Sequence, residues 1–172
     1  GYEKPCQFTF INKGISGNRI TDLIARYKQD FINLKPDYLS ILIGINDVWH
    51  EISFNNGVDT DKYELFYDML IKDIKKELPN TNIMILEPFV LKGSETEKDW
   101  ERFRHDAEEK AAVAKKIAEK NNLVFIPLME KFDEAAKTAP EIYWTKDGVH
   151  PTPMGHEIIK REWIKGFNLL NK

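Results

Sequence analysis

The sequence alternates short runs of apolar residues with longer segments in which apolar side chains recur about every 3.6 residues. Because the short runs are almost continuously apolar, they are typical of strands buried on both faces of a parallel sheet. The alternation therefore predicts repeated βα units around such a sheet. The four runs are Phe8–Ile11, Tyr38–Ile43, Ile83–Leu86 and Leu123–Ile126.

The longer segments predict four amphipathic helices, each with one apolar face that can pack on the sheet. The last helix is expected to begin near Pro153, because proline lacks the N–H that would be unpaired in the first helical turn. With helices on both sides of a parallel sheet, the predicted fold class is α/β, a three-layer α/β/α sandwich. The apolar positions that define these helices lie within residues 20–31, 63–78, 100–121 and 159–170.

The length and composition of the chain fit one globular domain. Its 172 residues are 42% hydrophobic and 31% charged, and no repeat, linker or compositional break divides them. A chain of this length buries roughly 70% of its unfolded surface, which is enough for a core without disulfides. The single cysteine, Cys6, excludes an internal disulfide and a zinc site made only of cysteines.

The charge and hydropathy of the chain exclude two classes of partner. The 25 Lys and Arg residues against 28 Asp and Glu residues give a net charge of -3, so binding to nucleic acid is not expected. The longest apolar run is far shorter than the ~20 residues that a membrane-spanning helix needs. A cytoplasmic location is only the default expectation, because a signal peptide would precede Gly1. Assembly into a homo-oligomer is left open.

Three unusual loops follow predicted strands or precede the last predicted helix. Ligands of parallel α/β sheets bind beyond the carboxyl ends of the strands, so reactive groups are expected in these loops. The loops are residues 12–18, 44–50 and 144–152, and all three can meet at one edge of the sheet.

Asp147 and His150 are three residues apart in a segment whose Gly148 and Pro151 favour a turn over a helix. In a turn, this spacing lets the carboxylate accept a hydrogen bond from imidazole Nδ1, which leaves Nε2 free to act as a base. A bare Asp-x-x-His segment is more often a solvated surface turn. A metal site has less support, because His150 and His156 are six residues apart and do not share a helical face.

Asn46 and Gly17 each have two interpretations. Asn46 follows Gly44 at a strand end, where its side chain can cap a turn or can donate N–H to a developing oxyanion. Gly17 can be a helix-entry residue needed for its backbone, or can offer an exposed N–H that binds an anion. Taken singly, each residue is better explained by the structural interpretation.

Taken together, three segments resemble the sequence blocks of the SGNH hydrolases, the GDSL-type esterase family. Residues 12–18 resemble the second block of that family, residues 44–47 the third and residues 147–151 the fifth, so the resemblance spans nearly the whole chain. It implies a flavodoxin-like α/β/α fold and a serine esterase that needs no metal and no organic cofactor. It also implies that His150 is the general base and Asp147 its orienting partner. Gly17 and Asn46 would be the donors of an oxyanion hole.

One block of the family is missing. The nucleophile of the family is the serine of a Gly-Asp-Ser motif that follows its first strand, and no Gly-Asp-Ser occurs in residues 1–172. Ser16 is a poor substitute, because it is not in a Gly-x-Ser-x-Gly elbow and stands beside the oxyanion glycine. We therefore expect a single SGNH hydrolase domain that is incomplete at its amino terminus and lacks its first strand.

Aromatic residues beside the blocks resemble the acetyl xylan and rhamnogalacturonan acetylesterase-like branch of the family. Trp49 and Trp144 are expected at the rim of the crevice to bind the faces of sugar rings, although tryptophan is about as often a packing residue. The absence of a long hydrophobic lid segment favours short acyl groups, acetyl above all. The expected partner is therefore a small-molecule or oligosaccharide ester.

Two alternatives to this esterase stay open. A non-catalytic glycan-binding domain would need no nucleophile, and the missing Gly-Asp-Ser is the only feature that supports it. A thioesterase or lysophospholipase of the same family can be distinguished from an acetylesterase only by assay.

Overall fold

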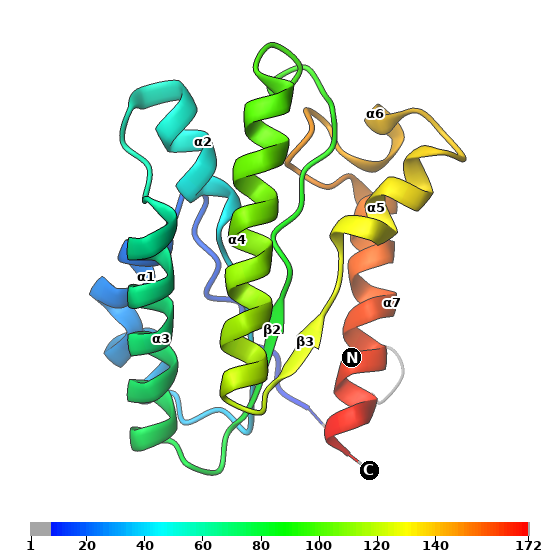
Figure 1. The fold of residues 1–172 in the computed structure, drawn as a ribbon. Helices are drawn as coiled ribbons and strands as arrows, with labels where there is room; N and C mark the ends of the chain where they lie inside the picture. Colours follow the sequence, from blue (N-terminus) through cyan, green and yellow to red (C-terminus); the bar gives the residue numbers. More distant parts are fainter. Residues whose placement is uncertain (1–7, 172) are drawn as a thin grey trace.

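The computed structural model describes residues 8–171, which form a central sheet with helices on both of its faces (Figure 1). Cys6 and the residues before it lie outside the described part of the chain. In chain order the elements are α1 (Ile20–Tyr27), the π-helix η1 (Lys28–Ile32), β1 (Tyr38–Leu42), α2 (Ile45–Phe54), α3 (Thr60–Glu77), β2 (Asn82–Leu86), α4 (Trp100–Lys120), β3 (Val124–Ile126), α5 (Met129–Ala136), α6 (Glu141–Trp144) and α7 (Pro153–Leu170).

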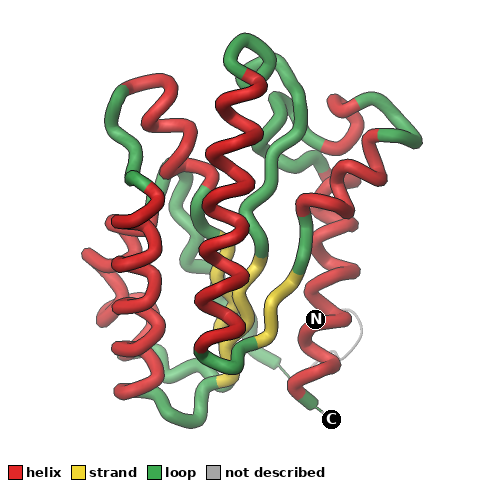
Figure 2. Tube along the Cα trace, viewed as in Figure 1, coloured by secondary structure: helices red, strands yellow, loops and turns green. Residues whose placement is uncertain are grey.

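The sheet contains three strands in the order β1-β2-β3, and both pairings are parallel (Figure 2). β1 pairs with β2 along its whole length, from Tyr38 to Leu42. β3 extends the sheet on the other side of β2, with Val124 beside Met84. Each connection between neighbouring strands contains at least one helix, as a parallel sheet requires and as the sequence predicts.

Alternate residues of β2 belong to two separate apolar cores, which makes the sheet the middle of three layers. Ile83 and Ile85 pack with α1, α3 and the carboxyl-terminal half of α4. Met84 and Leu86 pack with α5 and α7. All four side chains are buried, so both faces of β2 are sealed from water. The predicted α/β/α sandwich with a parallel sheet is confirmed.

The segment Phe8–Ile11 is not a strand, although its apolar run predicted one. It forms no ladder with β1 or with β3, the two edge strands of the described sheet. Phe8 packs edge-on against Phe167 of α7 with ring centroids 5.6 Å apart, while Phe10 is 62% exposed. Because a strand is held by hydrogen bonds to a neighbouring strand, an apolar run without such a neighbour stays irregular.

Residues 44–50, expected as a loop, contain the start of α2. The helix begins directly after Gly44, whose φ of 131° is readily adopted only by glycine. α5 and α6 are also absent from the sequence-based prediction, because helices of 8 and 4 residues are too short to show a clear apolar repeat. The longer helices α3, α4 and α7 lie where the apolar faces predict them. Among residues 8–171 no helix is both long and apolar enough to cross a bilayer.

Candidate active site

Asp147 and His150 lie in a tight turn between α6 and α7, at the carboxyl end of the sheet (Figure 1). Asp147 Oδ1 accepts hydrogen bonds from the backbone N–H groups of Val149, at 3.0 Å, and His150, at 2.8 Å. Asp147 Oδ2 lies 2.7 Å from His150 Nδ1. The carboxylate therefore holds the imidazole through Nδ1 and leaves Nε2 open.

The surroundings of Asp147 keep its carboxyl group ionised. Burial by itself would raise the pKa of Asp147, but the N–H groups of His150 and Val149 and the imidazole outweigh it and hold this pKa below its ordinary value of 3.8. The His150 side chain remains 55% exposed. A fixed carboxylate behind an open imidazole is the arrangement of a general base with its orienting partner.

Asn46 lies in the first turn of α2, and its side-chain amide points toward the loop 12–18. Its Nδ2 donates a hydrogen bond to the carbonyl oxygen of Asn18 at 3.1 Å. A turn-capping asparagine would accept a backbone N–H through Oδ1, and no such bond occurs in the described part of the chain. The amide group has a second N–H, which remains available to a ligand.

α2 lies beside both the loop 12–18 and His150. The Trp49 ring lies 5.5 Å from the His150 ring, measured between centroids. His50 Nε2 lies 3.9 Å from the position that a Cβ on Gly17 would occupy. Asn46, Trp49 and His50 are three and four residues apart, so they share one face of the helix. Gly17, Asn46 and His150 therefore all lie near one face of α2.

The loop 12–18 holds Gly17 in the left-handed region, with φ at 80°, where glycine is favoured. Arg26 of α1 ties the loop down, since its Nε donates to Asn18 Oδ1 at 3.0 Å and its Nη1 to the carbonyl of Lys13 at 2.9 Å. None of the hydrogen bonds within residues 8–171 uses the N–H of Gly17. Among the described residues that N–H has no hydrogen-bond partner, and a donor of this kind could bind an oxyanion.

Asp47 joins α2 to the start of α1, a role that sequence reasoning missed. Its side chain is buried, and both carboxylate oxygens lie near the N–H of Ile20, at 3.1 and 3.3 Å. Ile20 is the first residue of α1, so this contact fixes the start of α1 against α2. Burial raises the pKa of Asp47 to about 7. No local signal marks this role, because the partner of Asp47 lies on another element.

The two tryptophans predicted at the crevice rim differ in their contacts. Trp49 is half-buried and lies beside His150. The indole N–H of Trp144 donates to the carbonyl of Ala139 at 3.2 Å, and its ring packs at the edge of the core that α7 covers. The structure thus brings Trp49 to the site, whereas the contacts of Trp144 are those of a packing residue.

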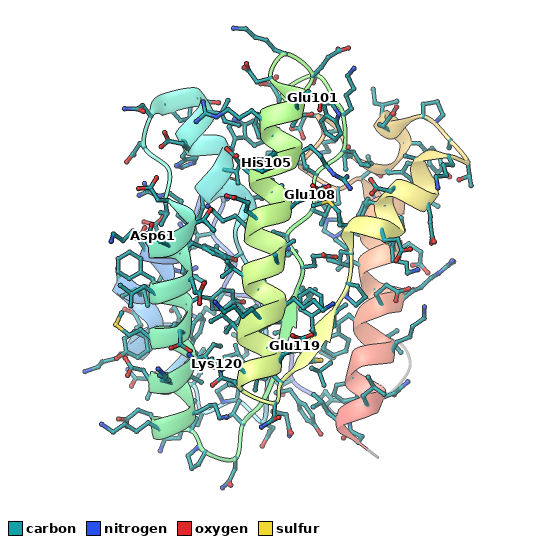
Figure 3. All side chains as sticks on the ribbon, viewed as in Figure 1. Asp61, Glu101, His105, Glu108, Glu119 and Lys120 are labelled. Carbon is teal, nitrogen blue, oxygen red and sulfur yellow. The ribbon has the colours of Figure 1, made fainter. Side chains whose placement is uncertain are left out.

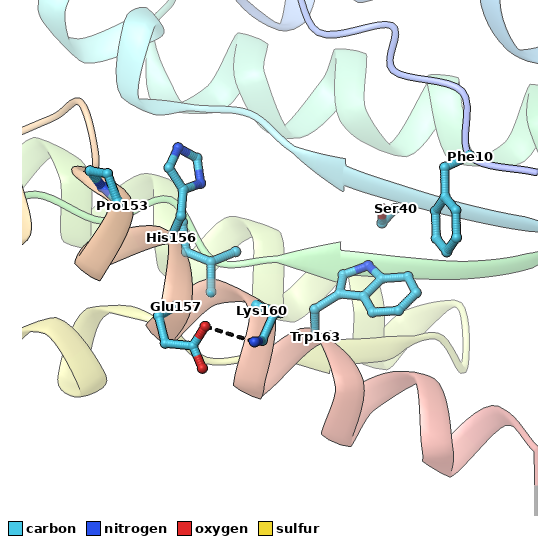
Figure 4. A pocket seen from close by; sticks show the side chains of 8 residues that line it. Phe10, Ser40, Pro153, His156, Glu157, Lys160 and Trp163 are labelled. Atoms are coloured by element: carbon cyan, nitrogen blue, oxygen red, sulfur yellow. Dashed lines mark ion pairs between the residues drawn. The ribbon is translucent and has the colours of Figure 1, made fainter. Parts of the chain in front are cut away.

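His156 lies in another part of the surface from the Asp147–His150 turn. It is in the first turn of α7, where its backbone N–H donates to the carbonyl of Thr152 at 2.8 Å. Its side chain lines an open groove of about 520 Å³ that also includes Ser40 of β1 and Trp163 of α7 (Figure 4). His150 does not line this groove.

One cluster of potential metal ligands occurs among the described residues, and it contains neither Asp147 nor His150. The ligand atoms of His105, Asp106 and Glu109 lie within 4.8 Å of one another on α4, where Figure 3 labels His105. These side chains are exposed or half-buried, and exposed acidic groups are common without a metal ion. The cluster therefore does not add a metal to the site described above.

Comparison with known proteins gives the family of the chain. The model of the GDSL-like lipase/acylhydrolase family matches residues 3–158, which is most of the chain. This chain belongs to that family. The resemblance found in the three sequence segments is thereby confirmed.

Relatives of this GDSL-family chain include proteins with solved structures. An acetylxylan esterase of Geobacillus stearothermophilus is 35% identical over 159 residues, which cover 90% of this chain and 70% of the esterase. A structure of that esterase matches with a TM-score of 0.80 over 91% of this chain and 70% of its own. A protein of Parabacteroides merdae described as a GDSL-like lipase is 38% identical, with a TM-score of 0.84 over 92% of this chain and 72% of its own. These similarities confirm the fold of the family.

Proposed function

We propose that this chain carries the general base and the oxyanion hole of a serine esterase that hydrolyses short-chain acyl esters, with acetyl esters of carbohydrates as favoured substrates. The observation that carries the proposal is the 2.7 Å contact between Asp147 Oδ2 and His150 Nδ1, which leaves Nε2 open as a base. Gly17 and Asn46, near the same face of α2, supply two N–H donors for an oxyanion.

In the proposed reaction a serine hydroxyl attacks the carbonyl carbon of the ester while His150 Nε2 takes the hydroxyl proton. The carbonyl oxygen becomes an oxyanion and accepts hydrogen bonds from the Gly17 N–H and from the second N–H of the Asn46 amide. His150 then gives its proton to the departing alcohol, and an acyl-enzyme remains. A water molecule, deprotonated by His150, completes the hydrolysis and releases the carboxylic acid and the serine.

The nucleophile is the one part of this mechanism for which the chain has no candidate. The serines of the chain are Ser16, Ser40, Ser53 and Ser94. None of them forms a hydrogen bond with His150 in the described residues. Catalytic mutants of the Geobacillus acetylxylan esterase replace a serine, an aspartate or a histidine. In that esterase the aspartate and the histidine are three residues apart, as Asp147 and His150 are.

The position of the serine in that relative supports a nucleophile from outside residues 1–172. In the relative, the catalytic serine precedes the catalytic aspartate by more residues than lie before Asp147 here. We infer that the counterpart of that serine belongs to a segment that is not part of this sequence. The 172 residues alone are then expected to be inactive.

The choice of substrate rests on the relatives and on Trp49. One relative is named an acetylxylan esterase, and its solved structures also describe it as an acetyl-xylooligosaccharide esterase. Trp49 places an aromatic ring beside the general base, where it can stack on the face of a sugar ring. Trp144 stays a prediction for this role, and its packing contacts give it less support.

The test uses the reading frame that encodes these residues, expressed both as residues 1–172 and from its own start codon. The substrates are p-nitrophenyl acetate, p-nitrophenyl octanoate and an acetylated xylo-oligosaccharide. We expect the full reading frame to hydrolyse both acetyl esters and to prefer acetate over octanoate. Residues 1–172 alone should show no activity above that of buffer.

Two results would contradict the proposal. The first is hydrolysis that persists at the parent rate in the His150→Ala variant of the full reading frame. The second is a reading frame that has no serine ahead of Phe8. That second result would favour the glycan-binding alternative, for which calorimetry with the acetylated xylo-oligosaccharide would show binding without hydrolysis.

A further inference from the structure

A second loop is hydrogen-bonded to the turn that carries Asp147 and His150. This loop, residues 91–97 between β2 and α4, is called the bracing loop below. Its Leu91 N–H donates a hydrogen bond to the carbonyl of Gly148 at 2.8 Å, and its Glu95 N–H donates to the carbonyl of Asp147 at 3.1 Å. The bracing loop therefore holds the two peptide carbonyls that lie between the carboxylate and the imidazole.

The bracing loop and the turn approach so closely that glycine is needed on both sides. A Cβ on Gly93 would collide with the peptide unit that joins Asp147 to Gly148. A Cβ on Gly148 would collide with Thr96 Oγ1 and with the carbonyl of Leu91, and the φ of Gly148 is 104°. Because the two backbones are in direct contact, the shape of the bracing loop sets the position of the turn.

The buried side chain of Thr96 stabilises this shape of the bracing loop through two hydrogen bonds to its backbone. Its side chain has 0% exposure although it is polar. Thr96 Oγ1 accepts a hydrogen bond from the Gly93 N–H at 2.8 Å and donates one to the carbonyl of Leu91 at 2.7 Å. A buried hydroxyl with two backbone partners is costly to remove, since both partners are then left unpaired.

The Asp147 and His150 side chains make few other contacts. His150 is more than half exposed, and its ring is contacted by Trp49 and by the carboxylate of Asp147. The Gly17 and Asn46 donors are positioned by other elements, so the turn must be placed correctly relative to them. A displacement of a catalytic group by about 1 Å can lower a rate by about 10²-fold.

We propose that Thr96 is a positioning residue of this site, which, through Leu91 and Gly93, sets the place of the Asp147–His150 turn and the direction of His150 Nε2. The side chain of Thr96 is fully buried, so it acts through the bracing loop and does not touch a substrate. The effect of Thr96 on catalysis depends on the proposed function. Its effect on the position of the Asp147–His150 turn can be measured without an activity assay.

The experiment compares Thr96→Val, Thr96→Ser and Thr81→Val in residues 1–172 and in the full reading frame. Thr81 is a matched control, because its Oγ1 donates to the carbonyl of Pro36 at 2.6 Å beside the opposite end of β2. NMR on protein with isotopically labelled histidine and aspartate follows the Nδ1 proton of His150 and the titration of the Asp147 carboxyl group. Thr96→Ala gives the same test if the valine variant does not fold.

In Thr96→Val we expect the His150 Nδ1 proton to exchange with water about 10-fold faster or more, because the turn opens more often. The pKa of Asp147 should rise toward its ordinary value, because the donors that lower it are held less steadily. Thr96→Ser should restore both signals, and Thr81→Val should change neither. Both valine variants should lower Tm by about 2–4 °C.

In the full reading frame, Thr96→Val should lower kcat about 10-fold or more and leave KM nearly unchanged. Equal NMR signals in the parent, Thr96→Val and Thr81→Val would overturn the inference and make Thr96 a structural residue only. If the NMR signals change as expected but no form of the protein hydrolyses esters, the positioning role stands and the proposed function fails.

Discussion

The two halves of the candidate active site, the Asp147–His150 turn and the loop 12–18, are held by different kinds of contact. The turn is held by backbone hydrogen bonds from the bracing loop and by direct contact between two backbones. The loop 12–18 is largely exposed and is held by side chains of other elements, namely Arg26 and Asn46. Asp47 fixes the start of the helix that follows the loop.

This difference indicates which half is more sensitive to substitution. Backbone hydrogen bonds in a buried place persist when surface side chains change, whereas each side-chain tie on an exposed loop is lost with a single substitution. We therefore expect His150, the proposed general base, to be rigidly placed before substrate binds. The proposed oxyanion donors, Gly17 and Asn46, should be the more adjustable half of the site.

The largest effect is expected for the turn itself. In the full reading frame, His150→Ala should lower kcat for p-nitrophenyl acetate by about 10⁴-fold or more, because the general base is lost. His156→Ala is the matched control and should keep most of the activity, since His156 lines the groove beside α7. Steady-state kinetics give kcat for both variants. Equal losses of kcat would show that His150 is not the general base.

The contact between Asp47 of α2 and the start of α1 should show a pH-dependent stability. Burial raises the pKa of Asp47 from 3.8 in the unfolded chain to about 7 in the folded one, and the attraction of Lys110 does not offset this. The buried carboxylate is thus destabilising when ionised, so its contribution to stability is full below pH 4 and is lost as the pH rises through 7. The loss amounts to about 4 kcal/mol in the free energy of unfolding.

Urea unfolding of the parent and of Asp47→Asn at pH 4.5 and pH 8 measures this contribution. Asparagine does not ionise, so the variant should lack the part of the pH dependence that Asp47 causes. Parallel changes in the two proteins between these pH values would show that Asp47 ionises normally in the fold.

The oxyanion half is probed most strongly at Asn46. Asn46→Ala should lower kcat by about 10²–10³-fold with little change in KM, because the donor acts on charge that exists only in the transition state. Asn46→Asp should be slower still, since its carboxylate repels the oxyanion and cannot donate to the carbonyl of Asn18. Kinetics on p-nitrophenyl acetate, with Tm measured in parallel, test both variants. An active Asn46→Asp enzyme would make Asn46 structural.

The smallest effect is expected for the hydrogen bonds from Arg26 of α1 to the loop 12–18. Arg26→Lys keeps the positive charge near Asp30 but loses the fork that reaches both Asn18 and Lys13. The free energy of unfolding should fall by about 1 kcal/mol. Hydrogen exchange should become faster in residues 12–18 and stay unchanged in residues 145–151. Faster exchange in both segments would mean that the two halves are held as one unit.

Local patterns in the sequence predicted the parts of the fold whose signal is local. α3, α4 and α7 each contain several turns of apolar periodicity, and the strands of the sheet are short, nearly continuous apolar runs. The Asp147–His150 turn was predictable because Gly148 and Pro151 disfavour a helix there. The three segments that carry the family resemblance contain Gly17, Asn46 and His150, which lie near α2 in the structure, and their catalytic roles stay predictions.

Features that depend on a distant partner were not predictable in this way. Phe8–Ile11 has the composition of a strand but finds no neighbouring strand in the described sheet. Asp47 and Thr96 look like ordinary polar residues in the sequence, and only the fold shows that they are buried against Ile20 and Gly93. The serine that we propose as the nucleophile could not be identified from residues 1–172.

The central claim is that Gly17, Asn46 and His150 surround one reactive serine. A crystal structure of the full reading frame after reaction with paraoxon would place a diethyl phosphoryl group on that serine. We predict that the phosphoryl oxygen lies within about 3 Å of Gly17 N and Asn46 Nδ2, with the serine oxygen beside His150 Nε2. A phosphoryl oxygen held by other donors, or a protein that paraoxon does not label, would contradict the claim.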